Sequence, residues 1–164
     1  MYVSAINGIL SLSASLVLHE MGHFFAARLT RVPVIEAGLG WGPKLLGVKT
    51  NGVDYQLRLL PLGAYIRMDI SALQKRPLFQ QLFVLLAGIA VNLILAAISW
   101  GTFFGTLNLV LALANLFPIY QQDGWKIGMV IFRRIFKRRS PVVEWSFTLY
   151  PALVGLAVLL RLLF

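Results

Sequence analysis

Long runs of apolar residues alternate with short basic segments along this chain. Residues 2–27 contain one acid, Glu20, and no lysine or arginine, while residues 82–122 and 145–160 contain no charged residue at all. A membrane-spanning helix needs about 20 largely apolar residues. The pattern therefore predicts an α-helical membrane protein with about four transmembrane helices, over residues 2–27, 78–100, 106–122 and 142–160.

The segment between the first two spans has a different periodicity. Apolar and polar residues alternate from Val53 to Leu59, as in a half-buried strand, and Asn51-Gly52 just before them is typical of a tight hairpin turn. We expect a hairpin of residues 44–49 and 53–60, a third strand over 62–68, and an irregular loop at Gly38, Gly40 and Gly42. This membrane-associated β region would cover about residues 36–68 of a single domain, 1–164.

The composition excludes several classes of protein. Hydrophobic residues make up 59% of the 164 residues and charged residues 13%, against roughly 45–50% and 25% in soluble domains. A soluble chain of this size could not bury so much apolar surface, and a disordered chain would have far fewer hydrophobic residues. The chain has no cysteine, which excludes disulfides and thiolate metal sites.

The basic residues that give the net charge of +9 are distributed as the predicted topology requires. Fourteen of the 15 lysines and arginines lie in residues 28–76 and 121–141, which four spans place on one side of the membrane. The positive-inside rule makes that side cytoplasmic and puts both termini outside. We interpret the basic run 133–139 as a topology signal that touches anionic lipid, and not as a nucleic-acid site. The first span is not expected to be a removable signal peptide, because it lacks a basic start and a small-residue cleavage site.

Both histidines of the chain lie in one motif, His19-Glu20-Met21-Gly22-His23. Positions i and i+4 share a helix face, so the two imidazoles could bind one Zn²⁺, with the glutamate placed to activate its water. The alternative, a pair of interfacial histidines, leaves Glu20 in a span without a cationic partner, which is costly. The motif thus favours one zinc ion per chain, within the bilayer and toward its cytoplasmic face.

A catalytic zinc ion has three protein ligands and an open position for water. Asp123 is a candidate, because it follows the third span on the same side as His23; an Asp-Gly turn with Gly124 is the alternative. Three asparagines in apolar helices, Asn92, Asn108 and Asn115, carry amides that need partners, and Pro118 interrupts the third helix near the expected metal.

Together these motifs resemble the site-2 protease family of intramembrane zinc metalloproteases. The first motif matches the family's HExxH, and residues 115–124 match its NxxPxxxxDG pattern at every fixed position. Residues 40–43 and 61–65 look like its β region, and residues 87–92 like its Gly-Pro-x-x-Asn element, with Ile89 in place of the proline. The resemblance covers roughly residues 10–130. Residues 101–106 leave room only for a turn, so we expect a minimal member without a PDZ domain between the second and third spans.

The resemblance implies a role for each matching residue. The zinc ligands would be His19, His23 and Asp123, and Glu20 would be the general base and acid. Asn92 would contact substrate near the reacting carbonyl, while Asn115 and Pro118 would shape the broken helix beside the metal.

The expected activity is hydrolysis of peptide bonds in or near the transmembrane segments of single-span proteins, as in regulated intramembrane proteolysis. The expected location is a prokaryotic cytoplasmic membrane. Two alternatives remain: an adaptor that holds zinc but cuts nothing, and a metal transporter. The intact Glu20 argues against the adaptor. The gathering of ionisable residues at one face argues against the transporter.

Overall fold

The computed structural model describes residues 2–136 and single positions between 142 and 161. The chain divides into two compact units, residues 1–112 and 113–164. The first unit holds the long helices and the sheet. The second begins in the last helical turn before Pro118 and contains the helix that starts at Asp123.

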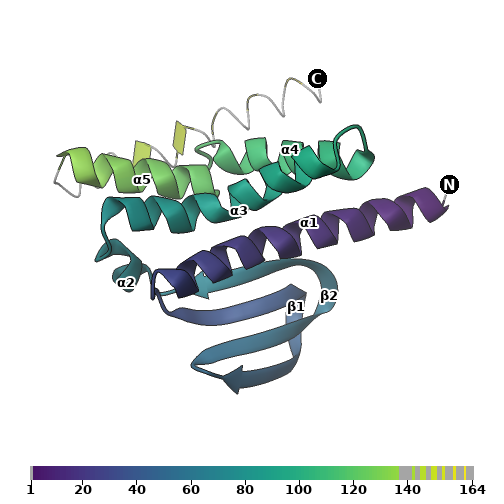
Figure 1. The fold of residues 1–164 in the computed structure, drawn as a ribbon, viewed down its shortest axis with the longest axis horizontal. Coiled ribbons are helices and arrows are strands. Elements are labelled where there is room, and N and C mark those ends of the chain that lie inside the picture. Colours follow the sequence, from purple (N-terminus) through teal and green to yellow (C-terminus); the bar gives the residue numbers. More distant parts are fainter. Residues whose placement is uncertain are drawn as a thin grey trace. The chain divides into compact units, whose positions relative to one another are not determined.

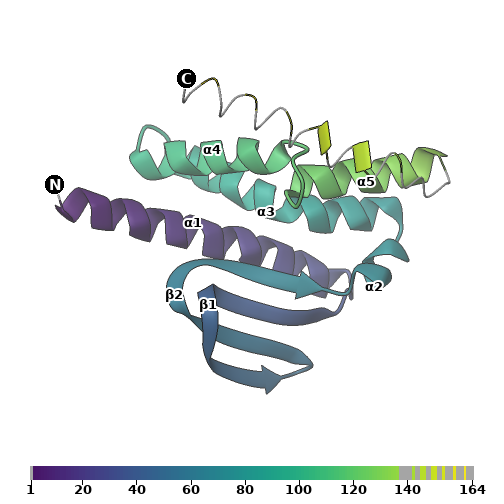
Figure 2. The same cartoon turned by 180° about the vertical axis from the view of Figure 1, so that it is seen from behind.

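Two long apolar helices form the frame of the first unit. Helix α1 (Tyr2–Leu29) lies between the sheet on one side and α3 (Leu78–Ile98) on the other (Figures 1 and 2). Both helices are long and apolar enough to cross a membrane, as the sequence predicts for two of its spans. Many of their large apolar side chains are exposed, including Ile9, Leu10, Ile94 and Ile98. Such surfaces suit contact with lipid.

The sheet consists of two long antiparallel strands, β1 (Val34–Thr50) and β2 (Val53–Met68). Both strands bend, so β1 meets β2 more than once: residues 36–39 pair with residues 64–67 and also with residues 54–57. The stretch 64–67 therefore lies between β1 and α1, and its backbone reaches the helix at Ile66. A short helix, α2 (Ile70–Gln74), follows, and the carboxylate of Asp69 caps its first turn.

The predicted hairpin is confirmed, and its neighbours need correction. Asn51 and Gly52 have φ values of 50° and 80°, as the tight turn between twisted strands requires. The expected loop at Gly38, Gly40 and Gly42 is wrong, because all three lie inside β1. Gly40 and Gly42 have φ near 90°, a conformation that favours glycine, where β1 changes its pairing partner. The expected separate third strand is the second half of β2, which continues through residue 61.

A buried carboxylate ties the bent strands together. Glu36 of β1 is 7% exposed and accepts a hydrogen bond from the Tyr65 hydroxyl of β2. Its other oxygen lies 2.7 Å from the Arg67 guanidinium. Arg58 donates to the Tyr65 oxygen at 3.0 Å and stacks on its ring at 5.0 Å. Arg58 also lies 3.5 Å from Glu36, so the partners of Glu36 come from two different stretches of β2 and fix the position of the stretch beside α1.

The third apolar helix is shorter than predicted. Helix α4 spans Phe103–Leu116, and not 106–122. It ends before Pro118, because proline has no N–H and disfavours helical conformation in the residue before it. Fourteen residues make about 21 Å of helix, less than the roughly 30 Å hydrocarbon core. The number of spans therefore stays a prediction, and the fourth expected span, 142–160, lies mostly outside the described residues.

The second unit contains a helix that the hydrophobic pattern of the sequence does not predict. Helix α5 (Asp123–Phe136) begins at Asp123 and is amphipathic, with Met129 buried and Arg133 and Arg134 in its last turn. Asp123 thus starts a helix, and the expectation that it ends the third span is wrong. Gly124 is required here, because a Cβ would collide with the carbonyl oxygens of Leu116 and Phe117.

Candidate active site

The two histidines of α1 lie on one face of the helix, one turn apart. Each is only 4% exposed, and their Nε2 atoms are 3.2 Å apart. The rings meet edge to face, with an interplanar angle of 78°. Two nitrogen ligands of one tetrahedral zinc ion, each 2.0–2.1 Å from the metal, would lie about 3.3–3.4 Å apart. The observed spacing therefore fits a shared zinc ion.

A backbone carbonyl of α3 orients the second ring. The Nδ1 atom of His23 lies 2.7 Å from the carbonyl oxygen of Val84. A carbonyl oxygen can only accept, so Nδ1 carries the hydrogen and donates it. The lone pair of the neutral ring is then on Nε2, the atom that faces His19. Metal-binding histidines in proteins are commonly oriented by this kind of contact.

Glycine in α3 makes room for the imidazoles. A Cβ at Gly88 would lie 2.7 Å from both Cε1 and Nε2 of His19 and would also collide with Nε2 of His23. On α1, a Cβ at Gly22 would meet the carbonyl oxygen of Ala87 at 2.8 Å. The two helices are therefore in near contact at this point, and no larger side chain fits between them without displacing a ring.

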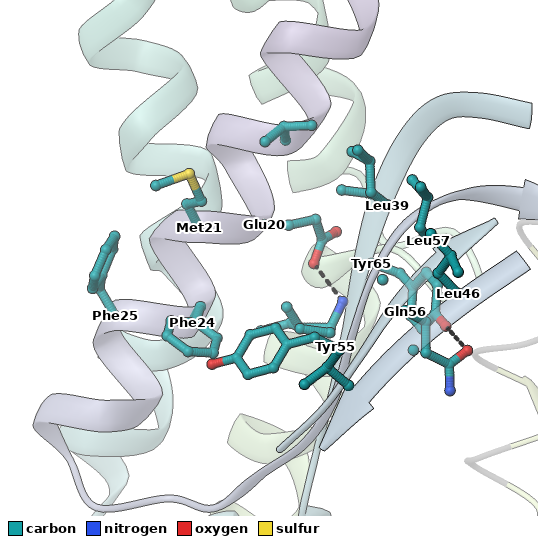
Figure 3. A pocket seen from close by; sticks show the side chains of 17 residues that line it. Glu20, Met21, Phe24, Phe25, Leu39, Leu46, Tyr55, Gln56, Leu57 and Tyr65 are labelled. Carbon is teal, nitrogen blue, oxygen red and sulfur yellow. Dashed lines mark hydrogen bonds between the residues drawn. The ribbon is translucent and has the colours of Figure 1, made fainter. Parts of the chain in front are cut away.

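Glu20 lies beside the histidines but faces the sheet. Its Oε2 atom accepts a hydrogen bond of 3.1 Å from the backbone N–H of Ile66, at the edge of β2 (Figure 3). Glu20 is partly exposed and lines a cavity of about 550 Å³ between α1 and the sheet. The carboxylate is therefore held by a backbone donor at the wall of this cavity.

Asn92 is fully buried one helical turn beyond Gly88. Neither polar atom of its side-chain amide has a hydrogen-bond partner among the described residues. Asn108 of α4 is equally buried, yet its amide donates to Ser15 Oγ and to the carbonyl oxygen of Phe104, both at 2.9 Å. Burying an amide without partners costs on the order of 1–3 kcal/mol. Because the Asn92 amide is buried at that cost without a partner among the described residues, Asn92 is a candidate for binding substrate.

The remaining predicted residues belong to the second unit. Asp123 is buried, and its Oδ1 lies 2.9 Å from Nζ of Lys126, one turn later in α5. Asn115 lies in the last turn of α4, and Pro118 follows in the connection to α5. The structure thus places His19, Glu20 and His23 on α1 and Asn92 one turn from Gly88 on α3, all within the first unit, while the other three residues lie in the second unit.

The sequence of the first unit matches a known family. A model of peptidase family M50 matches residues 7–104, which is more than half of the chain. The chain belongs to peptidase family M50. The predicted resemblance is therefore confirmed, and the match includes the paired histidines, Glu20, the sheet and Asn92. It ends before Asn115, Pro118 and Asp123.

Individual relatives of this M50 member carry corresponding names. A "putative zinc metalloprotease" of Clostridium acetobutylicum is 36% identical over 105 residues, which cover 59% of this chain and 31% of the relative. One of the same name from Clostridium perfringens is 38% identical over 106 residues, covering 60% and 31%. A chloroplastic membrane metalloprotease of Arabidopsis thaliana is 34% identical over 107 residues, covering 58% and 24%. The chain thus spans about a third or less of the length of these relatives.

Family membership and the structure agree on the general class of protein. The M50 match and the names of the relatives support a zinc metalloprotease of membranes. The two long apolar helices and the paired imidazoles suit that class. Two contacts of the site had no signal in the sequence, because Val84 and Ile66 contribute backbone atoms that any residue type would offer.

Proposed function

We propose that this M50 chain hydrolyses peptide bonds in or beside the membrane-spanning segments of single-span membrane proteins. One observation carries the proposal: two buried imidazole nitrogens lie 3.2 Å apart, and the residue that follows the first histidine in the chain is a glutamate that lines an apolar cavity. A soluble peptidase has no need to bury this chemistry between two helices with lipid-facing apolar surfaces.

We propose that Asp123 supplies the third zinc ligand. Two histidines leave a catalytic site one protein ligand short, and a carboxylate oxygen is an ordinary zinc donor. Asp123 is a buried acid within the NxxPxxxxDG pattern, and Lys126 at 2.9 Å would hold one of its oxygens in place. Asn115 and Pro118 would shape the helix break that precedes it.

Zinc held by these residues would lower the pKa of a bound water molecule and polarise the scissile carbonyl. Glu20 would take a proton from the attacking water as the water oxygen bonds to the carbonyl carbon, and would deliver that proton to the amine nitrogen as the C–N bond breaks. The Ile66 N–H keeps the carboxylate oriented during both transfers. The amide of Asn92, one turn from Gly88, is available to donate a hydrogen bond to the substrate near the reacting carbonyl.

The topology belongs to the same proposal. With four spans, 14 of the 15 lysines and arginines would lie on the cytoplasmic side, next to anionic lipid, and the zinc would lie near that face. Both termini would then be outside. Water would reach the site from the cytoplasm, which is the nearer aqueous phase.

Reconstitution of the full chain in lipid vesicles tests the proposal. The purified protein with zinc is mixed with a panel of single-span reporter polypeptides, and the products are mapped by mass spectrometry. Cuts within or a few residues beyond the spanning segment are expected. A protein that retains zinc but cuts no member of the panel would instead be an adaptor. Cuts confined to soluble flanks far from the span would contradict an intramembrane site.

A further inference from the structure

The cavity beside Glu20 has an apolar lining that the proposed chemistry does not explain. Its volume is about 550 Å³, within the range of sites that bind small molecules. Helix α1 contributes Val17, Met21, Phe24 and Phe25 to one wall, and the sheet contributes Leu39, Leu46, Val48, Tyr55 and Leu57 to the other (Figure 3). Glu20 is the only charged residue among those that line it.

Several lining side chains are exposed although they are large and apolar. Met21 is 42% exposed, Phe25 56%, Leu46 66% and Val48 66%. Two polar side chains of the sheet wall are engaged elsewhere: the Tyr65 hydroxyl binds Glu36, and the Gln56 side chain bonds to Asp54 and Arg58. The cavity therefore offers mainly apolar contact, and its remaining polar side chains are Glu20 and Tyr55.

Resting on the proposed function, we infer that this cavity is a specificity subsite for a large apolar side chain of the substrate. The occupant is inferred from Glu20, which lines the cavity and is the residue proposed to act on the scissile bond, so that a side chain near that bond would lie next to the lining residues. A leucine or phenylalanine side chain would bury its apolar surface against both walls, whereas alanine or glycine would leave most of the cavity unfilled. The enzyme would therefore select a leucine, phenylalanine or tryptophan at one fixed position relative to the cut.

A substitution at Leu57 can test the subsite, because a larger side chain there would narrow the cavity. Leu57 lies on β2 in the sheet wall, is 37% exposed, and takes no part in the hydrogen bond between Glu20 and Ile66. Leu59 is a matched control, because it is on the same strand, is 52% exposed and does not line the cavity. Tryptophan at position 57 would narrow the cavity, and tryptophan at position 59 would not.

The first experiment compares cleavage of single-span polypeptides that carry Ala, Leu, Phe or Trp at one scanned position. The full chain in vesicles should cut the Leu and Phe forms with kcat/KM at least about tenfold above the Ala form, at a fixed distance from that residue. Leu57→Trp should lower this preference about tenfold, whereas Leu59→Trp should keep the wild-type preference. Equal cleavage of all forms by the wild type, or an equal loss for all forms in Leu57→Trp, would overturn the inference.

The second experiment does not depend on cleavage. The Glu20→Gln variant is irradiated with a spanning polypeptide that carries benzoylphenylalanine at the same position, and the adducts are mapped. Adducts at residues 17–25 and 55–57 are expected. If a diazirine-labelled phospholipid labels these residues and the polypeptide does not, the cavity holds lipid and the inference fails. If the polypeptide labels them but the wild type cuts nothing, the subsite stands and the proposed function fails.

Discussion

The Nδ1 atom of His23 lies 2.7 Å from the carbonyl oxygen of Val84, which follows it by 61 residues in the chain. This contact joins the zinc-motif helix α1 to α3 and turns Nε2 toward His19. The geometry of the pair therefore depends on how closely α3 approaches, and Gly88 is the residue that permits the approach.

A methyl group at Gly88 should disrupt the metal site. In Gly88→Ala the new Cβ would lie 2.7 Å from the His19 ring, so one imidazole must rotate or the helices must separate. We expect zinc content, measured by plasma mass spectrometry after dialysis, to fall severalfold, with a stability loss of about 1–3 kcal/mol. Gly8→Ala is the matched control, because a Cβ at that helical position meets nothing within 4 Å. Full zinc retention in Gly88→Ala would show that the rings are not confined as described.

The two buried asparagines should respond in opposite ways to the same change. Asn92 has no hydrogen-bond partner among the described residues, so Asn92→Leu should leave the thermal midpoint unchanged or raise it while cleavage falls about 10-fold or more. Asn108 bonds to Ser15 and Phe104, so Asn108→Leu should cost about 1 kcal/mol. Thermal unfolding in detergent and cleavage rates check both expectations. A large stability loss in Asn92→Leu would mean that its amide is structural.

Glu36 should matter more to the sheet than an exposed acid of the same hairpin. Glu36→Gln weakens the contacts with Tyr65 and Arg67 and should cost roughly 1.5–3 kcal/mol of folding free energy, as expected for buried hydrogen bonds to a charged group. Faster amide exchange in residues 64–67 should accompany the loss. Asp54→Asn, at the exposed pair with Lys44, should change stability little. Equal effects of the two substitutions would contradict the role given to Glu36.

The Tyr65 hydroxyl should ionise at unusually high pH. Burial and the hydrogen bond to Glu36 raise the pKa of Tyr65 above its ordinary value of 10.0. Because the folded state holds this proton more tightly, the resulting stability is complete below about pH 10 and is lost as pH rises through the folded pKa. An ultraviolet titration of the wild type, corrected by that of Tyr65→Phe, should show a phenol that ionises at a higher pH in the folded protein than in denaturant. The same midpoint in the folded protein and in denaturant would refute the contact with Glu36.

Much of the fold follows from local patterns in the sequence. The apolar runs predict α1 and α3, because helices in lipid need little more than length and hydrophobicity. The Asn51-Gly52 turn predicts the hairpin, because few dipeptides adopt its positive φ values. The i, i+4 spacing of His19 and His23 places both rings on one face before any tertiary contact is known.

Other features depend on contacts that no local pattern encodes. Gly40 and Gly42 looked like loop residues, but the pairing of residues 36–39 with two stretches of β2 keeps them inside a bent strand. Helix α5 was not predicted because Lys126, Arg133 and Arg134 interrupt its apolar positions and leave no apolar run long enough for a span. The partners of His23 and Glu20 are backbone atoms, which are the same for every residue type. Asn92 could be singled out from the sequence, yet its lack of partners appears only in three dimensions.

The central claim is that Glu20 moves protons at a zinc ion held by His19 and His23, and one pair of measurements tests it most directly. Zinc content and cleavage of a spanning polypeptide are measured on the same preparations of wild type, Glu20→Gln and His23→Ala, with Asp54→Asn as a control. We expect about one zinc per chain in the wild type, in Glu20→Gln and in the control, and almost none in His23→Ala. Cleavage should fall about 10²–10⁴-fold in Glu20→Gln and remain at the wild-type rate in the control. Wild-type cleavage by Glu20→Gln, or full zinc in His23→Ala, would contradict the account.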